Sequence, residues 1–314
     1  FNIKGSAAGG GLSQCIPHSA LALGLTGDID AITNAHNLAM VALTARMQHE
    51  ANYTDERLAR SDIHRRLNVD PNNVAIKWAM DFCAQALRQI RIGLGGDRDG
   101  LEMDSGFQIS VSSELMAILA VAQDLADLRR RLAKMIVAYD TSGNEITTAD
   151  LEVDGAIAAW LSRAIDPNLL QSIEGQPVFV HAGPFANIAI GQSSIVADRL
   201  GVRLGEYLIT ESGFGADIGF EKFWNLKCRL SGLHPDAVVI VATTRALKWH
   251  GGGPDVKPGQ PLDEAYNHEN LALLEEGCAN LLAHIETVQK SGVKPVVCVN
   301  QFATDTEEEI ELIK

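Results

Sequence analysis

The chain has 314 residues, of which 46% are hydrophobic and 21% charged, a composition typical of folded globular proteins. Its 26 Lys and Arg against 40 Asp and Glu give a formal net charge of −14, which disfavours nucleic acids and anionic membranes as partners. The longest apolar runs fall short of the roughly 18 residues of a membrane helix, and the five scattered cysteines predict neither a disulfide framework nor a zinc site. We therefore expect a protein of the reducing cytoplasm.

The two ends of the chain predict a piece of a longer polypeptide. The opening segment, Phe1 to Gly11, has neither the charged start nor the apolar centre of a signal peptide. The other end, Lys314, lies inside an expected helix over 304–314 that has no stop signal. We expect a fragment that is incomplete at both ends.

The first segment that could carry chemistry is a run of small residues with one lysine, from Lys4 to Gly11. Backbone N–H groups can approach an anion here, so Lys4, Gly9, Gly10 and Gly11 are candidate contacts for phosphate or reacting groups. A flexible turn is the alternative interpretation. The run is not a Walker A loop, because no Gly-Lys pair occurs in the sequence.

Two carboxylates, Asp28 and Asp30, follow beside Thr26 and Gly27. Acids at this spacing can hold Mg²⁺ through water or orient a polar substrate. In the alternative interpretation the segment is a turn, and Asp28 caps the helix that follows it.

The rest of the first half is predicted to be mostly helical. A helix is expected to start at Ser112–Glu114 and to place its core residues near a 3.6-residue period. Those core residues are Leu115, Met116, Leu119, Leu125, Leu128, Leu132 and Ile136. The polar segment 47–73, which contains Pro71, is expected to be an exposed excursion.

From Pro177 onward, short β-branched runs alternate with glycine-marked loops and amphipathic stretches. The expected strands are 178–181, 207–210, 238–243 and 295–300, and the expected helices are 193–204, 221–230 and 271–289. This alternation predicts an α/β fold with a mostly parallel sheet and crossover helices. Ligands then bind just beyond the carboxyl ends of the strands, in the loops that start at His181, Thr210, Thr243 and Asn300.

Polar residues follow the last two expected strands. Arg245 and Lys248 belong to a local basic cluster in an acidic chain, which suits phosphate, with plain surface charge as the alternative. Asn300 and Asp305 could hydrogen-bond a nucleotide base, whereas Thr304 or Asp305 could instead cap the next helix.

Two further patterns in the sequence are weak. The segment Gly213 to Gly219 is similar to a dinucleotide fingerprint, but its last glycine comes one residue late. The histidines show no HExxH spacing, so no metal ligands are assigned.

Eight segments, in order across essentially the whole chain, resemble formate–tetrahydrofolate ligases. They are residues 1–11, 25–29, 107–117, 181–189, 211–219, 227–229, 241–252 and 300–305. The loops 181–184 and 251–254 resemble most closely the eukaryotic form of the family.

The resemblance implies a P-loop NTPase-like, three-layer domain that makes 10-formyltetrahydrofolate from formate, tetrahydrofolate and MgATP through formyl phosphate. It implies a phosphate loop upstream of Phe1 and a folate-binding region beyond Lys314, so that 1–314 is part of the large nucleotide-binding domain and is inactive alone. A homo-oligomer and a monovalent cation are implied as well.

The resemblance also assigns residues. Asp28 matches the family's acidic residue at the formyl phosphate site, and Gly9 to Gly11 match its glycine-rich segment near the reacting groups. The phosphate contacts expected of Lys4, Arg245 and Lys248 come from their local sequence and not from the resemblance.

Three positions depart from the family pattern, in which histidine is usual: Gly24, Asp30 and Ile190. Imidazoles supply proton transfer and hydrogen bonds, so one alternative is a diverged relative that binds without catalysis. A second, from another class, is a nicotinamide-dependent oxidoreductase that uses Gly213 to Gly219.

Overall fold

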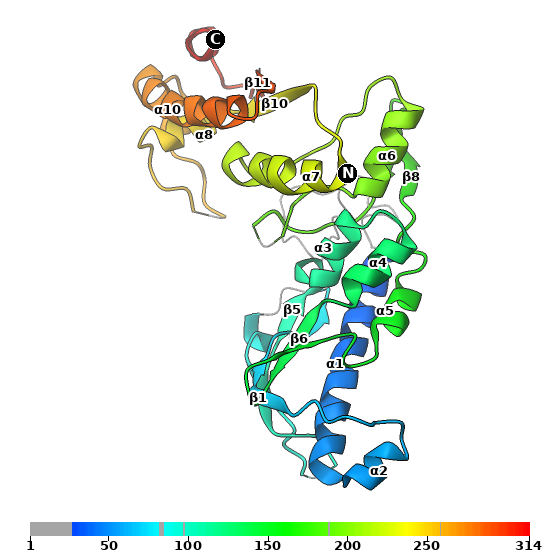
Figure 1. Ribbon diagram of the computed structural model, residues 1–314. Helices are drawn as coiled ribbons and strands as arrows, with labels where there is room; N and C mark the ends of the chain where they lie inside the picture. Colours follow the sequence, from blue (N-terminus) through cyan, green and yellow to red (C-terminus); the bar gives the residue numbers. More distant parts are fainter. Residues whose placement is uncertain (1–26, 82–84, 97, 188, 258) are drawn as a thin grey trace. The chain divides into compact units, whose positions relative to one another are not determined.

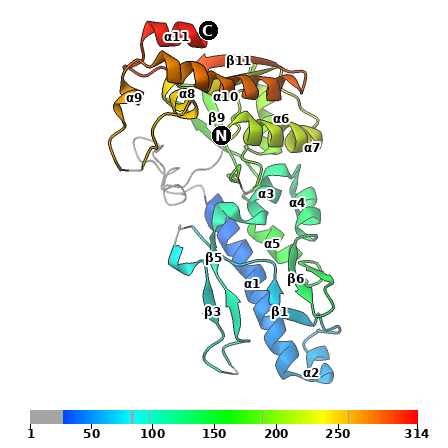
Figure 2. The same cartoon turned by 90° about the vertical axis from the view of Figure 1, so that its left-hand side faces the viewer.

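The computed structural model describes residues 27–314, apart from 82–84, 97, 188 and 258. It divides into two compact units, Phe1–Glu211 and Ser212–Lys314. Figures 1 and 2 show the helices and strands of each unit.

Unit 1 combines helices with short strands. Its helices are α1 (Asp28–Asn52), α2 (Asp55–Ala59), α3 (Glu114–Val121), α4 (Leu125–Leu132), α5 (Asp154–Trp160) and α6 (Ile195–Leu204), with 3-10 turns at Gln85–Leu87 and Ser110–Ser112. Its strands are β1 (Val69–Val74), β2 (Trp78–Met80), β3 (Ile90–Ile92), β4 (Met103–Ser105), β5 (Phe107–Ile109), β6 (Ile136–Asp140), β7 (Glu145–Thr147), β8 (Asn168–Gln171) and β9 (Pro177–Val180). The three-stranded sheet β1-β6-β7, the pair β3-β4 and the pair β8-β9 are antiparallel, whereas β2 and β5 pair in parallel.

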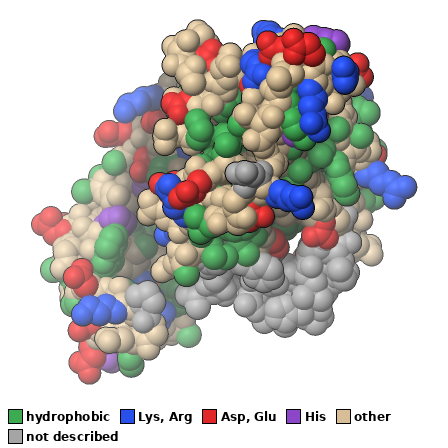
Figure 3. Space-filling model, turned by 90° about the horizontal axis from the view of Figure 1, so that it is seen from below, with side chains coloured by type: hydrophobic (Ala, Val, Ile, Leu, Met, Phe, Trp, Pro, Cys, Tyr) green, Lys and Arg blue, Asp and Glu red, His purple; other side chains and the backbone are tan. Residues whose placement is uncertain are grey.

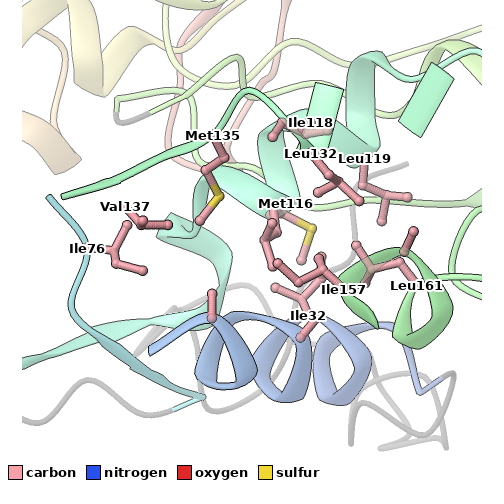
Figure 4. Close-up of a cluster of buried hydrophobic side chains, with 14 of the residues drawn as sticks. Ile32, Ile76, Met116, Ile118, Leu119, Leu132, Met135, Val137, Ile157 and Leu161 are labelled. Carbon is pink, nitrogen blue, oxygen red and sulfur yellow. The ribbon is translucent and has the colours of Figure 1, made fainter. Parts of the chain in front are cut away.

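The long helix α1 runs beside β6 and α5 and supplies one wall of the core (Figure 1). Its apolar residues recur every three or four positions and therefore share one buried face. That face carries Ile29, Ile32, Ala35, Ala39, Met40, Leu43 and Met47. Figure 4 shows Ile32 of this face pointing toward side chains of α3, α4 and α5, among them Met116, Leu132 and Ile157. Burying each such large side chain contributes about 1.5–3 kcal/mol, so this face contributes substantially to the apolar stabilisation of unit 1.

Unit 2 is a smaller helix-and-strand layer. Its elements are π-helical turns at Ala216–Phe220 and Phe223–Cys228, α7 (Arg229–Ser231), β10 (Ala237–Ala242), α8 (Thr244–His250), α9 (Glu264–Asn267), α10 (Leu271–Gln289), β11 (Lys294–Val299) and α11 (Glu307–Ile313). The strands β10 and β11 pair in parallel from Ala237↔Lys294 to Ala242↔Val299. Figure 2 shows α11 and β11 beside α10, which also packs on α8. The buried apolar core here is Ala242, Leu247, Leu274 and Leu281.

The helices α8 and α10 approach each other at two glycines. A Cβ on Gly277 would overlap the carbonyl oxygen of Leu247, and a Cβ on Gly251 would overlap that of Leu273. Only glycine permits this backbone-to-backbone contact.

The structure confirms some of the predicted helices and strands and contradicts others. The expected strands at 178–181, 238–243 and 295–300 are confirmed as β9, β10 and β11, and the expected helices at 193–204 and 271–289 as α6 and α10. The prediction of a strand at 207–210 is wrong, because these residues pair with no strand among the described residues. Tyr207 and Ile209 within this stretch are almost fully exposed. The stretch 221–230 is helical, but much of it is π-helix.

The expected helix 112–136 is two helices followed by a strand. Asp124 begins the second helix, because its carboxylate accepts a hydrogen bond from the N–H of Asp127 at 2.7 Å and so acts as its N-cap. Leu125, expected in the core, is 44% exposed at the start of that helix, and Ile136 lies on β6. The last helix is capped by Thr306, not by Thr304 or Asp305.

The segment 47–73 is not simply an exposed excursion, because it contains the end of α1, the whole of α2 and the start of β1. Leu58 and Leu67 within it are buried. The single, mostly parallel sheet is also not observed among the described residues: β9 pairs antiparallel with β8, and only β2-β5 and β10-β11 pair in parallel. The described chain is a mixed α/β structure with five small sheets.

Two buried histidines of unit 1, His36 and His181, have the same hydrogen-bonding pattern. Each Nε2–H donates to a backbone carbonyl, that of Lys77 or Ala164, at 2.5 Å. Each Nδ1 accepts from a serine hydroxyl, at 2.8 Å from Ser113 and 2.6 Å from Ser194. Both serines are also helix N-caps, of α3 and α6. This pattern fits neutral rings, and burial lowers the pKa of both histidines.

We expect Gly277→Ala to lower the free energy of unfolding of unit 2 by about 1–3 kcal/mol, because the new methyl group forces α8 and α10 apart. Urea unfolding measures the change. Gly155→Ala in α5 is the matched control, since its Cβ would meet only the end of the Arg129 side chain at 3.4 Å. The control should be neutral or stabilised by up to about 1 kcal/mol, as alanine favours helix. A Gly277→Ala protein as stable as the control would contradict the close contact.

We expect His36 and His181 to lower the free energy of unfolding as the pH drops below about 6.5, the unfolded pKa of histidine, while protonation of Asp28, whose folded pKa is raised to about 6, acts in the opposite direction. Because the folded pKa of His36 and of His181 is lowered, the unfolded chain takes up protons there first. Each histidine contributes at most about 1.4 kcal/mol per pH unit. Urea unfolding between pH 7.5 and 5.5 gives the slope. Glutamine does not titrate, so in His181→Gln the free energy of unfolding should change less steeply with pH, by the contribution of one histidine. A slope equal to that of the wild type would count against a neutral, buried His181.

Candidate functional site

Asp28 is the first residue of α1 and is buried, with 4% of its surface exposed. The preceding Gly27 is the N-cap, in a left-handed conformation (φ 81°), and no side chain caps the helix. The alternative of Asp28 as the helix cap is therefore wrong. Its Oδ2 instead accepts a hydrogen bond from Nδ2 of Asn168 at 2.6 Å. Burial raises the pKa of Asp28 to about 6, while the hydrogen bond from Asn168 acts in the lowering direction.

The first turns of α1 are fixed by buried and half-buried polar side chains. Thr33 Oγ1 lies 2.5 Å from Ser110 Oγ. His36 bonds to the hydroxyl of Ser113 and to the carbonyl of Lys77. Asn37 pairs with the backbone of Ala79 at two points: its Nδ2 donates to the carbonyl at 2.9 Å, and its Oδ1 accepts from the N–H at 2.8 Å. Because these bonds join α1 to segments far along the chain, they fix the position of Asp28 at the helix start.

Two more carboxylates lie near this helix end. Asp30 is exposed. Burial, followed by the charge of Asp30, raises the pKa of Asp81, whose Oδ1 is buried and has no hydrogen-bond partner among the described residues. Across residues 27–314 with their gaps, no group of three His, Cys, Asp or Glu side chains could hold a metal ion.

The predicted anion contacts Lys4, Gly9, Gly10 and Gly11 lie outside the described residues, as does Gly24. Their predicted roles therefore stay predictions. Ile190, at a usual histidine position of the family, is 8% exposed and belongs to the apolar core of unit 1.

In unit 2, Arg245 lies in a polar and aromatic setting beyond β10. Its Nη2 donates to Asn267 Oδ1 at 3.1 Å and to Thr304 Oγ1 at 3.4 Å. Its guanidinium carbon lies 4.1 Å from the centroid of the Phe302 ring. Its Nε is buried without an acceptor among the residues that the structure describes. This guanidinium is held in place yet keeps one donor unsatisfied.

Lys248 differs from Arg245, because it is buried in an ion pair. Its Nζ lies 2.5 Å from Glu309 Oε1 and donates to the carbonyl of His268 at 2.8 Å, and both charged side chains are at most 1% exposed. Glu309 Oε1 also accepts from the N–H of Asn270 at 2.9 Å. The predicted contact of Lys248 with phosphate would require this ion pair to open.

Asn300 and Asp305 both follow β11 but are held differently. Asn300 is exposed, and its N–H donates to the carbonyl of Ala242 at 2.8 Å, which extends the parallel pairing. Asp305 accepts from Thr244 Oγ1 at 2.7 Å and from the N–H of Phe302 at 2.9 Å. Asp305 therefore braces the loop after β11 against the start of α8, and Asn300 is the member of the pair that is open to a ligand.

Sequence reasoning missed some of these partners. Phe302 and Thr304 lie inside 300–305, one of the segments that resemble the ligase family, so the sequence did point to this stretch. Asn168 is 140 positions from Asp28 and belongs to no segment singled out in the sequence, so nothing pointed to it. The dinucleotide-like Gly213 to Gly219 follows no strand and leads into π-helical turns, which removes the context that fingerprint needs.

The cavity, the charged surface and the helices of the described chain point to no further site. A cavity of about 460 Å³ in unit 1 is lined mainly by apolar side chains, including Met47, Trp78 and Phe107, and by none of the predicted site residues. On the face shown in Figure 3, the coloured Lys and Arg side chains are interspersed with Asp and Glu. No helix in the described part of the chain is long and apolar enough to cross a membrane.

Comparison with known proteins gives one family across the whole chain. A model of the family "Formate--tetrahydrofolate ligase" matches residues 1–314. Proteins with this name include one from Dehalococcoides mccartyi (strain ATCC BAA-2266 / KCTC 15142 / 195), 69% identical over 314 residues, which are 100% of this chain and 52% of the relative. Another, from Desulfotalea psychrophila, is 64% identical over 314 residues, with 100% of this chain and 56% of the relative covered.

A third relative of that name, from Thermodesulfovibrio yellowstonii, is 60% identical over 317 residues, which cover 100% of this chain and 54% of the relative. The chain thus spans about half the length of the curated relatives it matches. These relatives are bacterial and do not support the predicted likeness to the eukaryotic form. The chain belongs to the formate–tetrahydrofolate ligase family.

Proposed function

We propose that the full-length protein containing this chain ligates formate to tetrahydrofolate at the expense of ATP, giving 10-formyltetrahydrofolate. Family membership over all 314 residues supports the reaction. The observation that carries the proposal within the structure is Asp28, a buried carboxylate with its pKa raised to about 6 and held by Asn168. Strongly shifted carboxylates of this kind are typical of reaction sites.

The reaction has two steps in this proposal. An oxygen of formate attacks the γ-phosphorus of ATP, which gives formyl phosphate and ADP. The N10 amine of tetrahydrofolate then attacks the formyl carbon, phosphate leaves, and N10 loses a proton. Asp28 orients the reacting centre and accepts this proton, because a carboxylate with a pKa of about 6 is mostly ionised at pH 7 and is more basic than an ordinary one.

The nucleotide is proposed to bind beyond the carboxyl ends of β10 and β11. Parallel strands leave polar loops at this edge, and Arg245, Asn300 and Asp305 all follow these strands. Arg245 has an unsatisfied donor for an anion, and Asn300 is exposed. Asp305 supports the loop.

Several finer expectations belong to the same proposal. We place residues 1–314 in a P-loop NTPase-like nucleotide-binding domain, with Lys4 and Gly9 to Gly11 at the reacting phosphates. A cytoplasmic location is proposed on the pattern of scattered cysteines. A homo-oligomeric assembly and activation by a monovalent cation are proposed on the family resemblance alone.

The central test is Asp28→Asn in the full-length protein, assayed with formate, tetrahydrofolate and MgATP. We expect kcat to fall about 10²–10⁴-fold, because the proton acceptor is lost. The thermal midpoint should stay or rise, since a buried charge is removed. Asp30→Asn, which changes an exposed carboxylate two residues away, is the matched control and should keep most of the turnover. Unchanged turnover in Asp28→Asn would refute its catalytic role, and an inactive wild type would favour the non-catalytic relative.

Arg245 and Lys248 should respond differently to loss of charge. Arg245→Met is expected to raise the KM for ATP at least tenfold, because one charge-assisted hydrogen bond contributes about 1.5–3 kcal/mol. Lys248→Met leaves Glu309 buried and unpaired and is expected to destabilise unit 2 by about 3–5 kcal/mol. Steady-state kinetics and urea unfolding on both variants check this. An Arg245→Met enzyme with normal KM would remove Arg245 from the nucleotide site.

A further inference from the structure

Asn168 joins Asp28 to a strand pair that lies far from it in sequence. Its Nδ2 donates to Asp28 Oδ2 at 2.6 Å and lies 3.3 Å from the carbonyl oxygen of Val180. The two hydrogens of one amide nitrogen are thereby both used. Asn168 is half-buried at the start of β8, where it is directly opposite Val180 of β9.

The strand pair is held at the end that carries Asn168, where β8 starts and β9 ends. His181 follows Val180 directly, and its Nε2–H donates to the carbonyl of Ala164, four residues before Asn168. Its Nδ1 accepts from Ser194, which caps α6. The side chain of Asn168 therefore starts from a fixed backbone position, and its amide cannot follow a moving carboxylate without breaking these contacts.

We propose that Asn168 is a positioning residue for Asp28: by binding Oδ2, it fixes the carboxylate plane and leaves Oδ1 as the oxygen that accepts the proton. This rests on the proposed function of Asp28. A donor aimed at one carboxylate oxygen favours the ionised form and opposes the effect of burial. Without Asn168, Asp28 is both less ionised near neutral pH and free to rotate.

The first experiment measures the Asp28 carboxyl group itself. The 314-residue chain is labelled with ¹³C at the aspartate side chains, and the Asp28 signal is identified by its loss in Asp28→Asn. Asn168→Leu removes both N–H donors at nearly constant size. Its expected effect is to raise the pKa of Asp28 by about one unit. Gln171→Leu is the matched control on the same strand, since Gln171 is exposed and donates to the carbonyl of Gly175.

The second experiment uses the full-length protein. In Asn168→Leu, the acid limb of the pH profile of kcat/KM should move to higher pH by the same amount, and kcat should fall about tenfold or more at pH 7, whereas Gln171→Leu should match the wild type. Asn168→Thr also removes the amide and introduces a residue that favours strands. It should behave like Asn168→Leu and replaces that variant if the leucine variant folds poorly.

The outcomes separate this inference from the proposed function. A titration of Asp28 that is the same in wild type and Asn168→Leu overturns the role of Asn168, whatever the activity. A shifted titration with an unmoved pH profile overturns it as well, because the carboxylate then responds to Asn168 without consequence for the reaction. Full turnover in Asp28→Asn would instead refute the proposed role of Asp28.

Discussion

Unit 1 depends on one requirement: the buried and half-buried polar groups on the first turns of α1 must find partners on other segments. Thr33, His36 and Asn37 lie on this helix beside its apolar residues, and each reaches a residue at least 41 positions away. A buried polar group without a partner costs about 1–3 kcal/mol, so these bonds select one register of the helix against its neighbours. Apolar contact alone would tolerate a small rotation of α1, whereas the hydrogen bonds do not.

The fixed register explains how a carboxylate can be kept at a buried helix start. Two effects oppose each other at Asp28: burial favours the neutral acid, and the amide of Asn168 favours the anion. The favourable charge-assisted bond is available only because α1 and the β8-β9 pair are each held by a buried histidine that bonds to a serine helix cap. Structural histidines thus support the carboxylate without contacting it.

The sequence indicated the local elements better than their long-range partners. Strands β9 to β11 and helices α6 and α10 follow from periodicity and β-branched runs. The motif around Asp28 predicts it as a site residue, and this stays a prediction. The run 207–210 has the composition of a strand, but composition cannot supply a neighbouring strand to pair with. In the same way, the partners of Asp28 and Lys248 could not be predicted, because Asn168 and Glu309 come close to them only through tertiary structure.

The close contact between α8 and α10 limits how unit 2 can change during evolution. When a side chain blocks a larger neighbour, trimming that side chain can restore the fit. At Gly251 and Gly277 the obstacles are the carbonyl oxygens of Leu273 and Leu247, which every amino acid possesses. No second substitution in the opposite helix can therefore make room, and neither glycine can change unless the helices move apart. A descendant with a larger residue at either position would need a differently packed unit 2.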